Sequence, residues 1–352
     1  MYFLEKALIQ IHLPSDNDSL QSAYYRLKFD EYFFFQIVLA MNKHQISNCK
    51  SKKFNDLGEY AISMYKSLDF KLTDSQIKVM QDIRKDLTSE KPMNRLVQGD
   101  VGCGKTIIAM LTAAIIVGAG SQVAIMAPTE ILAEQHYESF IKYCEHLKIS
   151  CEILISNINA KGKQILYRKI KDGSAQIVIG THALIQEKVE FKDLSLVVID
   201  EQHRFGVEQR KKLINKGVHI NILAMTATPI PRTLTFAIHG DMDLSWINEL
   251  PQDRKPIKTK IIDYKEINSI YNKMKTEMDN GRFCFIVFPI IQESDKIDAE
   301  DAESAYKKFK KGIFSNYTLG FLHGKLKTEE KKILMEKVNN GEIQCLVSTT
   351  VV

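Results

Sequence analysis

From about residue 90 onward, short apolar runs alternate with longer amphipathic stretches along the chain. The runs are nearly continuous in hydrophobic residues, as strands are when a sheet buries them on both faces. Alternation of this kind predicts βαβ units and therefore a mostly parallel α/β sheet with helices on both sides. The predicted strands are 95–98, 122–126, 151–155, 176–179, 196–199 and 222–225.

The first 70 residues follow a different pattern. Polar residues that favour helix N-caps precede an apolar-rich run in which Leu27, Phe34 and Met41 recur at helical spacing. The aromatic cluster 32–35 has two interpretations. It is either a platform on which bases stack or, as we favour, part of a helix buried against a neighbouring element. The polar, lysine-bearing segment 42–56 predicts a loop.

The alternation stops at 250–256, where two prolines and three charged residues predict a linker. It then restarts, which predicts a second α/β domain that begins within this chain and is not finished by its end. An open parallel sheet of three strands would leave an unpaired apolar edge. The predicted strands are 283–288, 318–321 and 343–348, and the predicted helices are 300–311 and 328–340.

Composition narrows the class of protein. A chain of 352 residues suggests two domains, and 45% apolar with 26% charged residues excludes collagenous, low-complexity and wholly disordered proteins. The 48 basic and 43 acidic residues leave a net charge of +5, which is compatible with a nucleic-acid partner but does not establish one. No apolar run reaches the roughly 18 residues of a membrane span. Six scattered cysteines without a C-x-x-C pair favour a reducing compartment.

A glycine-rich segment fits the pattern G-x-x-x-x-G-K-[ST] between a predicted strand and a predicted helix at 107–117. Its backbone amides and the helix N-terminus would bind phosphate oxygens. Lys105 would reach the β- and γ-phosphates, and the Thr106 hydroxyl would ligate Mg²⁺. The segment therefore predicts an ATP site. It consists of Gly99, Asp100, Val101, Gly102, Cys103, Gly104, Lys105 and Thr106.

Cys103 lies inside this phosphate-binding loop. We favour the interpretation that it is a small filler residue. The alternative is a reactive thiol of lowered pKa, because loop amides and Lys105 would stabilise a thiolate.

An acidic pair, Asp200 and Glu201, follows the apolar predicted strand 196–199 directly. The carboxyl ends of parallel strands are where an α/β sheet presents its chemistry. Asp200 would hold Mg²⁺, and Glu201 would orient and deprotonate the attacking water. Such pairs often do no more than end a strand, but behind a phosphate-binding loop the pair predicts an ATPase.

Together, the phosphate-binding loop and the D-E-Q-H run at 200–203 resemble the motor of superfamily-2 helicases. The resemblance extends to segments similar to helicase motifs Ia, Ib and III and to the Q-motif, at 127–136, 180–184, 226–229 and 70–76. It implies a P-loop NTPase fold of the RecA-like type, with ATP and Mg²⁺ as cofactors. It also implies that Gln76 reads adenine, that Phe70 stacks on the base, and that His203 belongs to the catalytic set.

The same resemblance implies a set of residues that contact DNA phosphates or couple DNA to the nucleotide. For His182 the alternative is a packed core histidine, and we favour the DNA contact. The residues are Pro128, Thr129, Gly180, Thr181, His182, Thr226, Thr228 and Arg232.

Longer runs at 200–210, 225–234 and 240–256 are similar to the bacterial branch-migration helicases of this superfamily. The transcription–repair coupling translocases are the alternative, but they carry a second glutamate where this chain has Gln202. The resemblance implies a cytoplasmic, nucleoid-associated protein of DNA repair and recombination. It would act as a monomer on forks, Holliday junctions and R-loops, away from membranes.

The resemblance also implies the domain boundaries. Residues 1–60 would be a helical connector that follows an absent wedge domain, 61–250 the ATP-binding domain, and 251–352 an incomplete second motor domain. Because motif V and the arginine finger of motif VI are not in the sequence, we expect weak ATP binding, little hydrolysis and no unwinding by this chain alone. A nucleotide-gated DNA-binding module without turnover is the rival hypothesis. A small-molecule kinase would have no use for the D-E-Q-H run.

Overall fold

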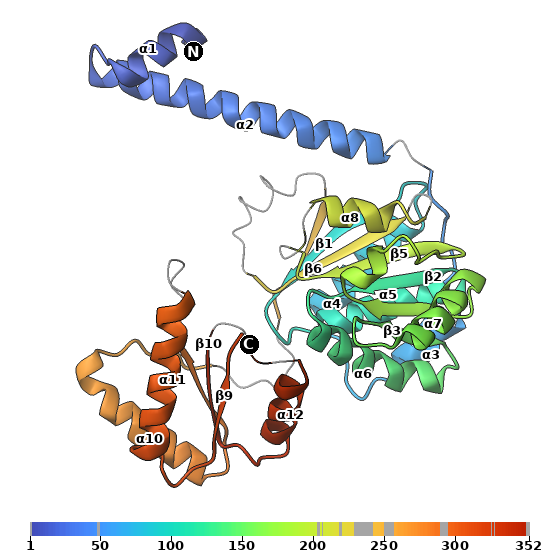
Figure 1. Ribbon diagram of the computed structural model, residues 1–352. Helices are drawn as coiled ribbons and strands as arrows, with labels where there is room; N and C mark the ends of the chain where they lie inside the picture. The colour runs from blue at the N-terminus through green and yellow to red at the C-terminus, as the bar shows by residue number, and fades with distance from the viewer. Residues whose placement is uncertain are drawn as a thin grey trace. The chain divides into compact units, whose positions relative to one another are not determined.

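The computed structural model describes residues 2–47, 50–202, 205, 207–217, 220–228, 242–249, 257–288, 295–324, 326 and 328–349. The chain divides into two compact units, unit 1 (Met1–Arg254) and unit 2 (Lys255–Val352). In Figure 1, unit 1 runs from blue to yellow and unit 2 from orange to red. None of the described helices is long and apolar enough to cross a membrane.

Unit 1 contains a seven-stranded parallel sheet in the order β3-β4-β2-β5-β6-β1-β7. All six strands expected from the apolar runs are present, and the parallel α/β fold is confirmed. The seventh strand, β7, was not predicted because its residues do not form a continuous apolar run. The strands are β1 (Asn94–Gly99), β2 (Gln122–Met126), β3 (Cys151–Leu154), β4 (Ile177–Gly180), β5 (Leu194–Asp200), β6 (Asn221–Thr226) and β7 (Asp243–Ile247).

Helices cover both faces of this sheet, and the alternation of side chains along β5 makes this plain. Leu196 and Val198 point into one core cluster, whereas Val197 and Ile199 belong to a second cluster on the opposite face. The helical segments are α3 (Gly58–Lys66), α4 (Asp74–Leu87), α5 (Lys105–Gly118), α6 (Glu130–His146), α7 (Ala160–Asp172), the 3₁₀ turn η1 (His182–Ile185) and α8 (Val207–Ile214).

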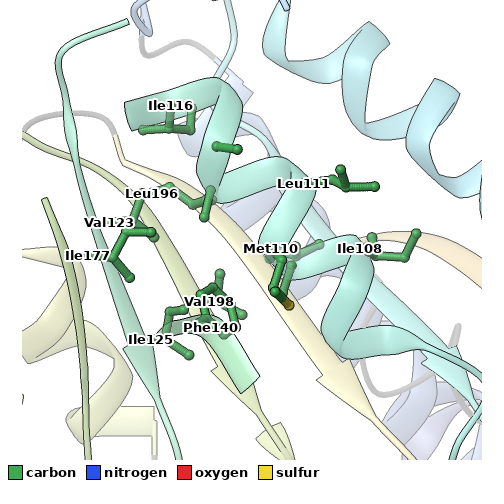
Figure 2. Packing of buried hydrophobic residues seen from close by; sticks show 14 of the residues in the cluster. Ile108, Met110, Leu111, Ile116, Val123, Ile125, Phe140, Ile177, Leu196 and Val198 are labelled. Carbon is green, nitrogen blue, oxygen red and sulfur yellow. The ribbon is translucent and has the colours of Figure 1, made fainter. Parts of the chain in front are cut away.

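The helix that follows the phosphate-binding loop, α5, is buried along almost its whole length. Ile108 and Ile116 on this helix are fully buried and belong to the same core cluster as Val123, Leu196 and Val198 of the sheet, part of which Figure 2 shows. A helix that is apolar on all sides lies inside a protein rather than on its surface. The first turn of α5, which carries Lys105, is therefore held firmly against the sheet.

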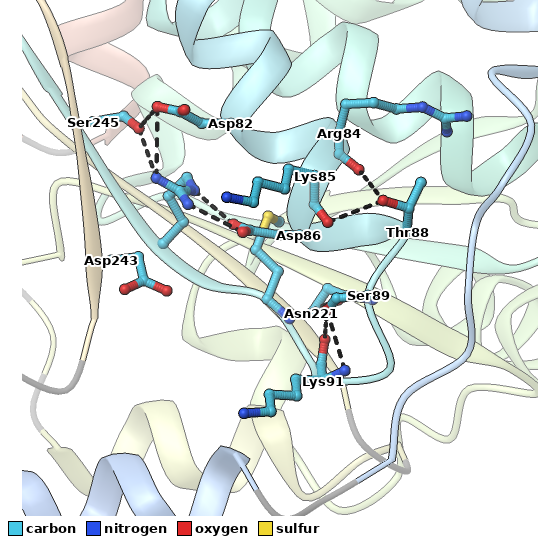
Figure 3. A network of polar contacts seen from close by, with 12 residues as sticks. Asp82, Arg84, Lys85, Asp86, Thr88, Ser89, Lys91, Asn221, Asp243 and Ser245 are labelled. Carbon is cyan, nitrogen blue, oxygen red and sulfur yellow. Dashed lines mark hydrogen bonds and ion pairs between the residues drawn. The ribbon is translucent and has the colours of Figure 1, made fainter.

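A buried ion-pair network ties α4 to the sheet (Figure 3). The Arg95 guanidinium on β1 donates to Asp86 at 2.6 Å and 3.1 Å and to the Ser245 hydroxyl at 2.8 Å. Ser245 in turn donates to Asp82 at 2.8 Å. Burial opposes the charge of Arg95, but Asp86 and Asp82 outweigh it and raise its pKa. The network fixes the helix whose N-terminus carries Gln76.

The N-terminal segment forms α1 (Leu4–His12) and the long helix α2 (Asn17–Ser47). The Asp16 carboxylate caps α2 by accepting from the Ser19 amide at 2.7 Å. The expected helix is thus present, but it runs through residues 42–47, which the polar composition had predicted to be a loop. Lysine, glutamine and histidine are polar without being helix breakers, so composition alone misplaced the end.

The predicted burial of the aromatic face of α2 is wrong for the described residues. The helices α1 and α2 pack on each other, with Ala7 and Ala23 fully buried. Tyr32 and Phe34, in contrast, are 62% and 64% exposed. Helical periodicity identifies an apolar face, but it does not supply the element that covers it.

Unit 2 contains a three-stranded parallel sheet in the order β8-β10-β9. Its core includes the fully buried Phe314, Cys345 and Val347. The three expected strands are all present. The elements are η3 (Tyr264–Glu266), α10 (Ile267–Asp279), β8 (Cys284–Phe288), α11 (Asp295–Lys311), β9 (Leu319–Leu322), α12 (Thr328–Asn339) and β10 (Cys345–Thr349).

Candidate nucleotide and DNA site

The phosphate-binding loop connects the end of β1 to the start of α5, as the sequence predicts. Gly102 and Gly104 have φ angles of 77° and 90°, a region that favours glycine. A β-carbon on Gly104 would lie 2.2 Å from the Gln76 amide nitrogen, so a side chain there would displace Gln76 from its contact with the loop. Both positions of the loop therefore favour glycine.

The Lys105 side chain folds back onto this loop. Its ammonium donates to the carbonyl oxygens of Gly99 and Asp100 at 2.7 Å and 3.0 Å, and the side chain is almost fully buried. Thr106 follows it in the first turn of α5, where the helix N-terminus provides positive potential. Both side chains lie where the sequence predicts the triphosphate.

A cavity of about 520 Å³ opens beside the loop. Gln76 and the half-exposed Phe70, the two residues predicted to contact adenine, both line it. The Gln76 side chain is buried between two partners, because it accepts from the Thr73 amide at 2.8 Å and donates to the Cys103 carbonyl at 2.8 Å. The residues lining the cavity are Phe70, Lys71, Thr73, Gln76, Gly102, Gly104, Thr106, Ile107, Met110, Ser139, Lys142 and Tyr143.

The alternative of a reactive thiolate at Cys103 is wrong. The side chain is fully buried, and burial raises the pKa of its thiol above the ordinary value. The nearby Lys105 charge works in the opposite direction but offsets only part of this effect. Cys103 is thus the small filler that we favoured, and its sulfur occupies the space beside Gly99.

Asp200 ends β5 at the same sheet edge as the loop. Its carboxylate is buried and lies 2.8 Å from the Nε2 atom of His136, a residue of α6. The other carboxylate oxygen accepts from the Glu201 amide at 3.1 Å. The partnership between Asp200 and His136 is absent from the sequence predictions, because 64 residues separate the two side chains along the chain.

Glu201 has a φ angle of 50°, which is uncommon for a residue with a side chain. Strained backbone of this kind gathers at functional sites. The Thr226 hydroxyl lies 3.5 Å from the Glu201 carboxylate and 2.8 Å from the Thr228 hydroxyl. The Gln98 side chain donates to the Thr228 carbonyl at 3.1 Å. The segment similar to motif III therefore lies against the predicted general base.

The residues predicted to contact DNA divide into exposed and buried groups. Thr129 and His182 are exposed, and Pro128 and Thr228 are half-buried. The exposure of His182 contradicts the alternative of a packed core histidine. Two predicted residues, His203 and Arg232, lie outside the described residues. Gly180, Thr181 and Thr226 are buried.

Thr181 does not offer its hydroxyl to a DNA phosphate in this structure. The side chain is buried, and its oxygen has no hydrogen-bond partner among the described residues. Any DNA contact at this position would use the backbone or require the segment to move. Thr129 instead has a clear local role, because it caps α6 by accepting from the Leu132 amide at 3.3 Å.

The residues at the phosphate-binding loop suit Mg²⁺. A hard cation bound with a nucleotide takes few protein ligands, all of them oxygen, and completes its octahedron with phosphates and waters. The Thr106 hydroxyl and the Asp200 carboxylate provide this donor chemistry at one sheet edge. Among the described residues no cluster of three or more His, Cys, Asp or Glu side chains forms a metal cage.

A model of the DEAD/DEAH box helicase family matches residues 73–236. The chain is 42% identical to the ATP-dependent DNA helicase RecG of Synechocystis over 99% of this chain and 42% of that protein. The Bacillus subtilis protein of the same name is 41% identical over 99% of this chain and 51% of its own length. The chain thus spans about half the length of the curated relatives it matches.

Among solved structures, one titled as RecG bound to a three-way DNA junction matches with a TM-score of 0.82 and 38% identity. The match covers 98% of this chain and 45% of that one. Yeast Dbp5 bound to RNA matches with a TM-score of 0.58 at 20% identity, a similarity that shows the fold alone.

Proposed function

The chain belongs to the RecG family of ATP-dependent DNA helicases, and from this we propose that it is part of an ATP-driven motor that acts on branched DNA. The observation that carries the proposal is that the phosphate-binding loop follows β1 and that Asp200 and Glu201 lie at the end of β5 of one parallel sheet, so both lie at the same sheet edge. Two sequence segments that are far apart thereby supply the parts that phosphoryl transfer needs.

Each residue has a defined role in this proposal. The loop amides and Lys105 bind the β- and γ-phosphates, while Thr106 and Asp200 hold Mg²⁺. The ion, when bound, neutralises charge on the phosphates and keeps them in line for attack. Glu201 orients the attacking water and accepts its proton. Phe70 and Gln76 bind the adenine in the adjacent cavity. His203 is the remaining residue of the proposed catalytic group.

On the DNA side, we propose that Thr129 and His182 contact backbone phosphates, because exposed hydroxyl, imidazole and loop amide groups suit contacts that do not depend on sequence. Thr226 would relay the state of the nucleotide from Glu201 toward the DNA. The substrates would be stalled forks that the motor reverses and Holliday junctions that it migrates, with R-loops as a related branched form. We propose that it acts as a monomer in the bacterial cytoplasm, associated with the nucleoid.

The test is Mg-ATP hydrolysis by this chain with and without forked DNA, alongside Glu201→Gln. The matched control is Glu138→Gln, which changes an exposed glutamate on α6. Because Glu201 handles the attacking water, we expect Glu201→Gln to retain nucleotide binding and to lower any turnover at least about a hundredfold. The control should match the wild type.

Three results discriminate between the hypotheses. Fork-stimulated turnover that Glu201→Gln abolishes supports the motor and contradicts our expectation of weak hydrolysis by this chain alone. ATP-dependent DNA affinity without turnover favours the nucleotide-gated module. Failure of the wild type to bind Mg-ATP at all would refute the proposed nucleotide site.

A further inference from the structure

We propose that His136 on α6 is a positioning residue that holds the Asp200 carboxylate in the orientation needed to bind Mg²⁺. The inference rests on the proposed ATPase function. It adds a residue, His136, that has not so far been assigned a role in the site. The residue acts through Asp200 and would not itself touch the nucleotide or the ion.

The contact is short and shielded from water. His136 Nε2 lies 2.8 Å from Asp200 Oδ2, and the two residues are only 8% and 9% exposed. A carboxylate that binds Mg²⁺ can only accept hydrogen bonds, so the proposal requires the tautomer in which Nε2 carries the proton and donates it. In a buried setting such a charge-assisted bond is stronger than a neutral one.

The second oxygen of Asp200 is also held, because it accepts from the Glu201 amide at 3.1 Å. Two donors on different oxygens prevent the carboxylate from rotating. A carboxylate has about four lone-pair sites, so two remain for a metal ion or a metal-bound water. The arrangement thus orients Asp200 without consuming its capacity to bind Mg²⁺.

The contact is not needed to hold the strand in place. Asp200 ends β5, which is a central strand with backbone pairing to β2 on one side and β6 on the other. A histidine whose task was only to fill the core would gain as much from a backbone carbonyl. Here the imidazole donates instead to the one side chain at this strand end that the proposed mechanism assigns to the metal.

His136 is itself firmly positioned by its helix. Thr129 caps α6, and the Glu130 carboxylate near its start accepts from the Ser156 amide at 2.8 Å. One turn beyond His136, Phe140 is fully buried in the main core cluster. Groups that orient metal ligands in this way typically change metal affinity or activity by about 10–100-fold when they are removed.

The experiment compares His136→Asn with His136→Gln, both polar and uncharged. The glutamine amide nitrogen reaches about as far as imidazole Nε2, whereas that of asparagine stops short of Asp200. His146→Asn, at the exposed end of the same helix, is the matched control. Binding of a fluorescent ADP analogue is titrated with Mg²⁺ and, separately, measured in EDTA, and circular dichroism checks that each variant folds.

We expect His136→Asn to raise the Mg²⁺ concentration at half-saturation by about tenfold or more, with binding in EDTA unchanged. His136→Gln should stay within about threefold of the wild type, and His146→Asn should match it. Near-normal Mg²⁺ dependence in His136→Gln but not in His136→Asn would show that a donor at the Nε2 position, and not the imidazole ring itself, maintains Mg²⁺ binding.

Two results would overturn the inference. One is an unchanged Mg²⁺ dependence in His136→Asn. The other is an equal loss of binding in EDTA and in Mg²⁺ for both variants, which would mean that His136 only supports the fold. Absence of Mg²⁺-dependent binding in the wild type is a different outcome, because it would refute the proposed function first and the inference with it.

Discussion

The two parallel sheets of this protein differ in how completely they are covered. In unit 1, all seven positions of β5 are buried. In unit 2, β8 alternates half-buried with exposed positions, and Phe285 and Val287 are 50% and 53% exposed. Parallel sheets normally bury both faces. The predicted nucleotide chemistry lies on the sheet that helices cover on both sides, where close packing holds side chains in fixed positions.

The ion pairs show the same difference. Arg95 of unit 1 is buried between two carboxylates, whereas the Lys307–Glu303 and Arg282–Glu277 pairs of unit 2 lie largely in solvent. A buried pair is costly to break, because removal of one partner leaves an unpaired charge away from water. An exposed pair contributes little. Loss of a partner of Arg95 should therefore destabilise unit 1 far more than loss of a partner in either exposed pair destabilises unit 2.

The largest expected effect concerns thiol reactivity. Cys103, Cys144 and Cys151 of unit 1 are buried, whereas Cys284 of unit 2 is half-buried. For a domain stabilised by about 5 kcal/mol, buried thiols should react roughly a thousandfold more slowly than Cys284. Alkylation followed by mass spectrometry measures each rate. Comparable rates at all four residues would mean that the cores around the three unit 1 cysteines open as readily as the half-buried site of Cys284.

The next effect is on the buried ion-pair network of unit 1. Asp86→Ala leaves Arg95 without its main partner and should lower the free energy of unfolding by about 3 kcal/mol. Urea unfolding followed through Trp246, the one tryptophan of the sequence, reports on this unit. The matched change in unit 2, Glu303→Ala, should lower the free energy of unfolding of that unit by less than about 0.5 kcal/mol. Pulsed alkylation of the buried Cys345 during urea unfolding measures it. Equal losses would contradict the contrast between the units.

A pair of valine substitutions tests the sheet faces directly. Val198 on β5 is fully buried, and Val287 on β8 is exposed. Val198→Ala should destabilise unit 1 by about 2 kcal/mol through lost burial and a small cavity. Val287→Ala should change unit 2 by no more than about 0.5 kcal/mol. A large loss at Val287 would instead mean that this face is covered in solution.

The smallest effect is on the helix cap that holds Gln76 near the phosphate-binding loop. Thr73 and Gln76 form a reciprocal capping box at the start of α4. Thr73→Ala should lower the free energy of unfolding by about 1 kcal/mol. It should also weaken nucleotide binding, because the cap holds Gln76, whose side chain donates to the Cys103 carbonyl of the phosphate-binding loop. Thr276→Ala within α10 should not lower the free energy of unfolding, since alanine is a better helix former. Urea unfolding and binding of the ADP analogue measure both effects.

Much of this protein was determined by local sequence. The glycines at 102 and 104 can adopt positive φ angles that other residues avoid, so the phosphate-binding loop was predictable from eight consecutive positions. Most strands were also predictable, because a buried strand is apolar along its length, whereas β7 with its mixed residues was not. The carboxylate pair at Asp200 and Glu201 followed from its place at the end of such a strand.

What only the tertiary structure decided are the contacts between segments that are distant in sequence. The hydrogen bond from His136 to Asp200, the burial of the Thr181 hydroxyl and the raised pKa of Cys103 all depend on which elements pack together. The exposure of Phe34 on α2 belongs to the same class. Periodicity and local motifs report on backbone conformation, whereas burial and hydrogen-bond partners depend on neighbours that a linear pattern does not specify.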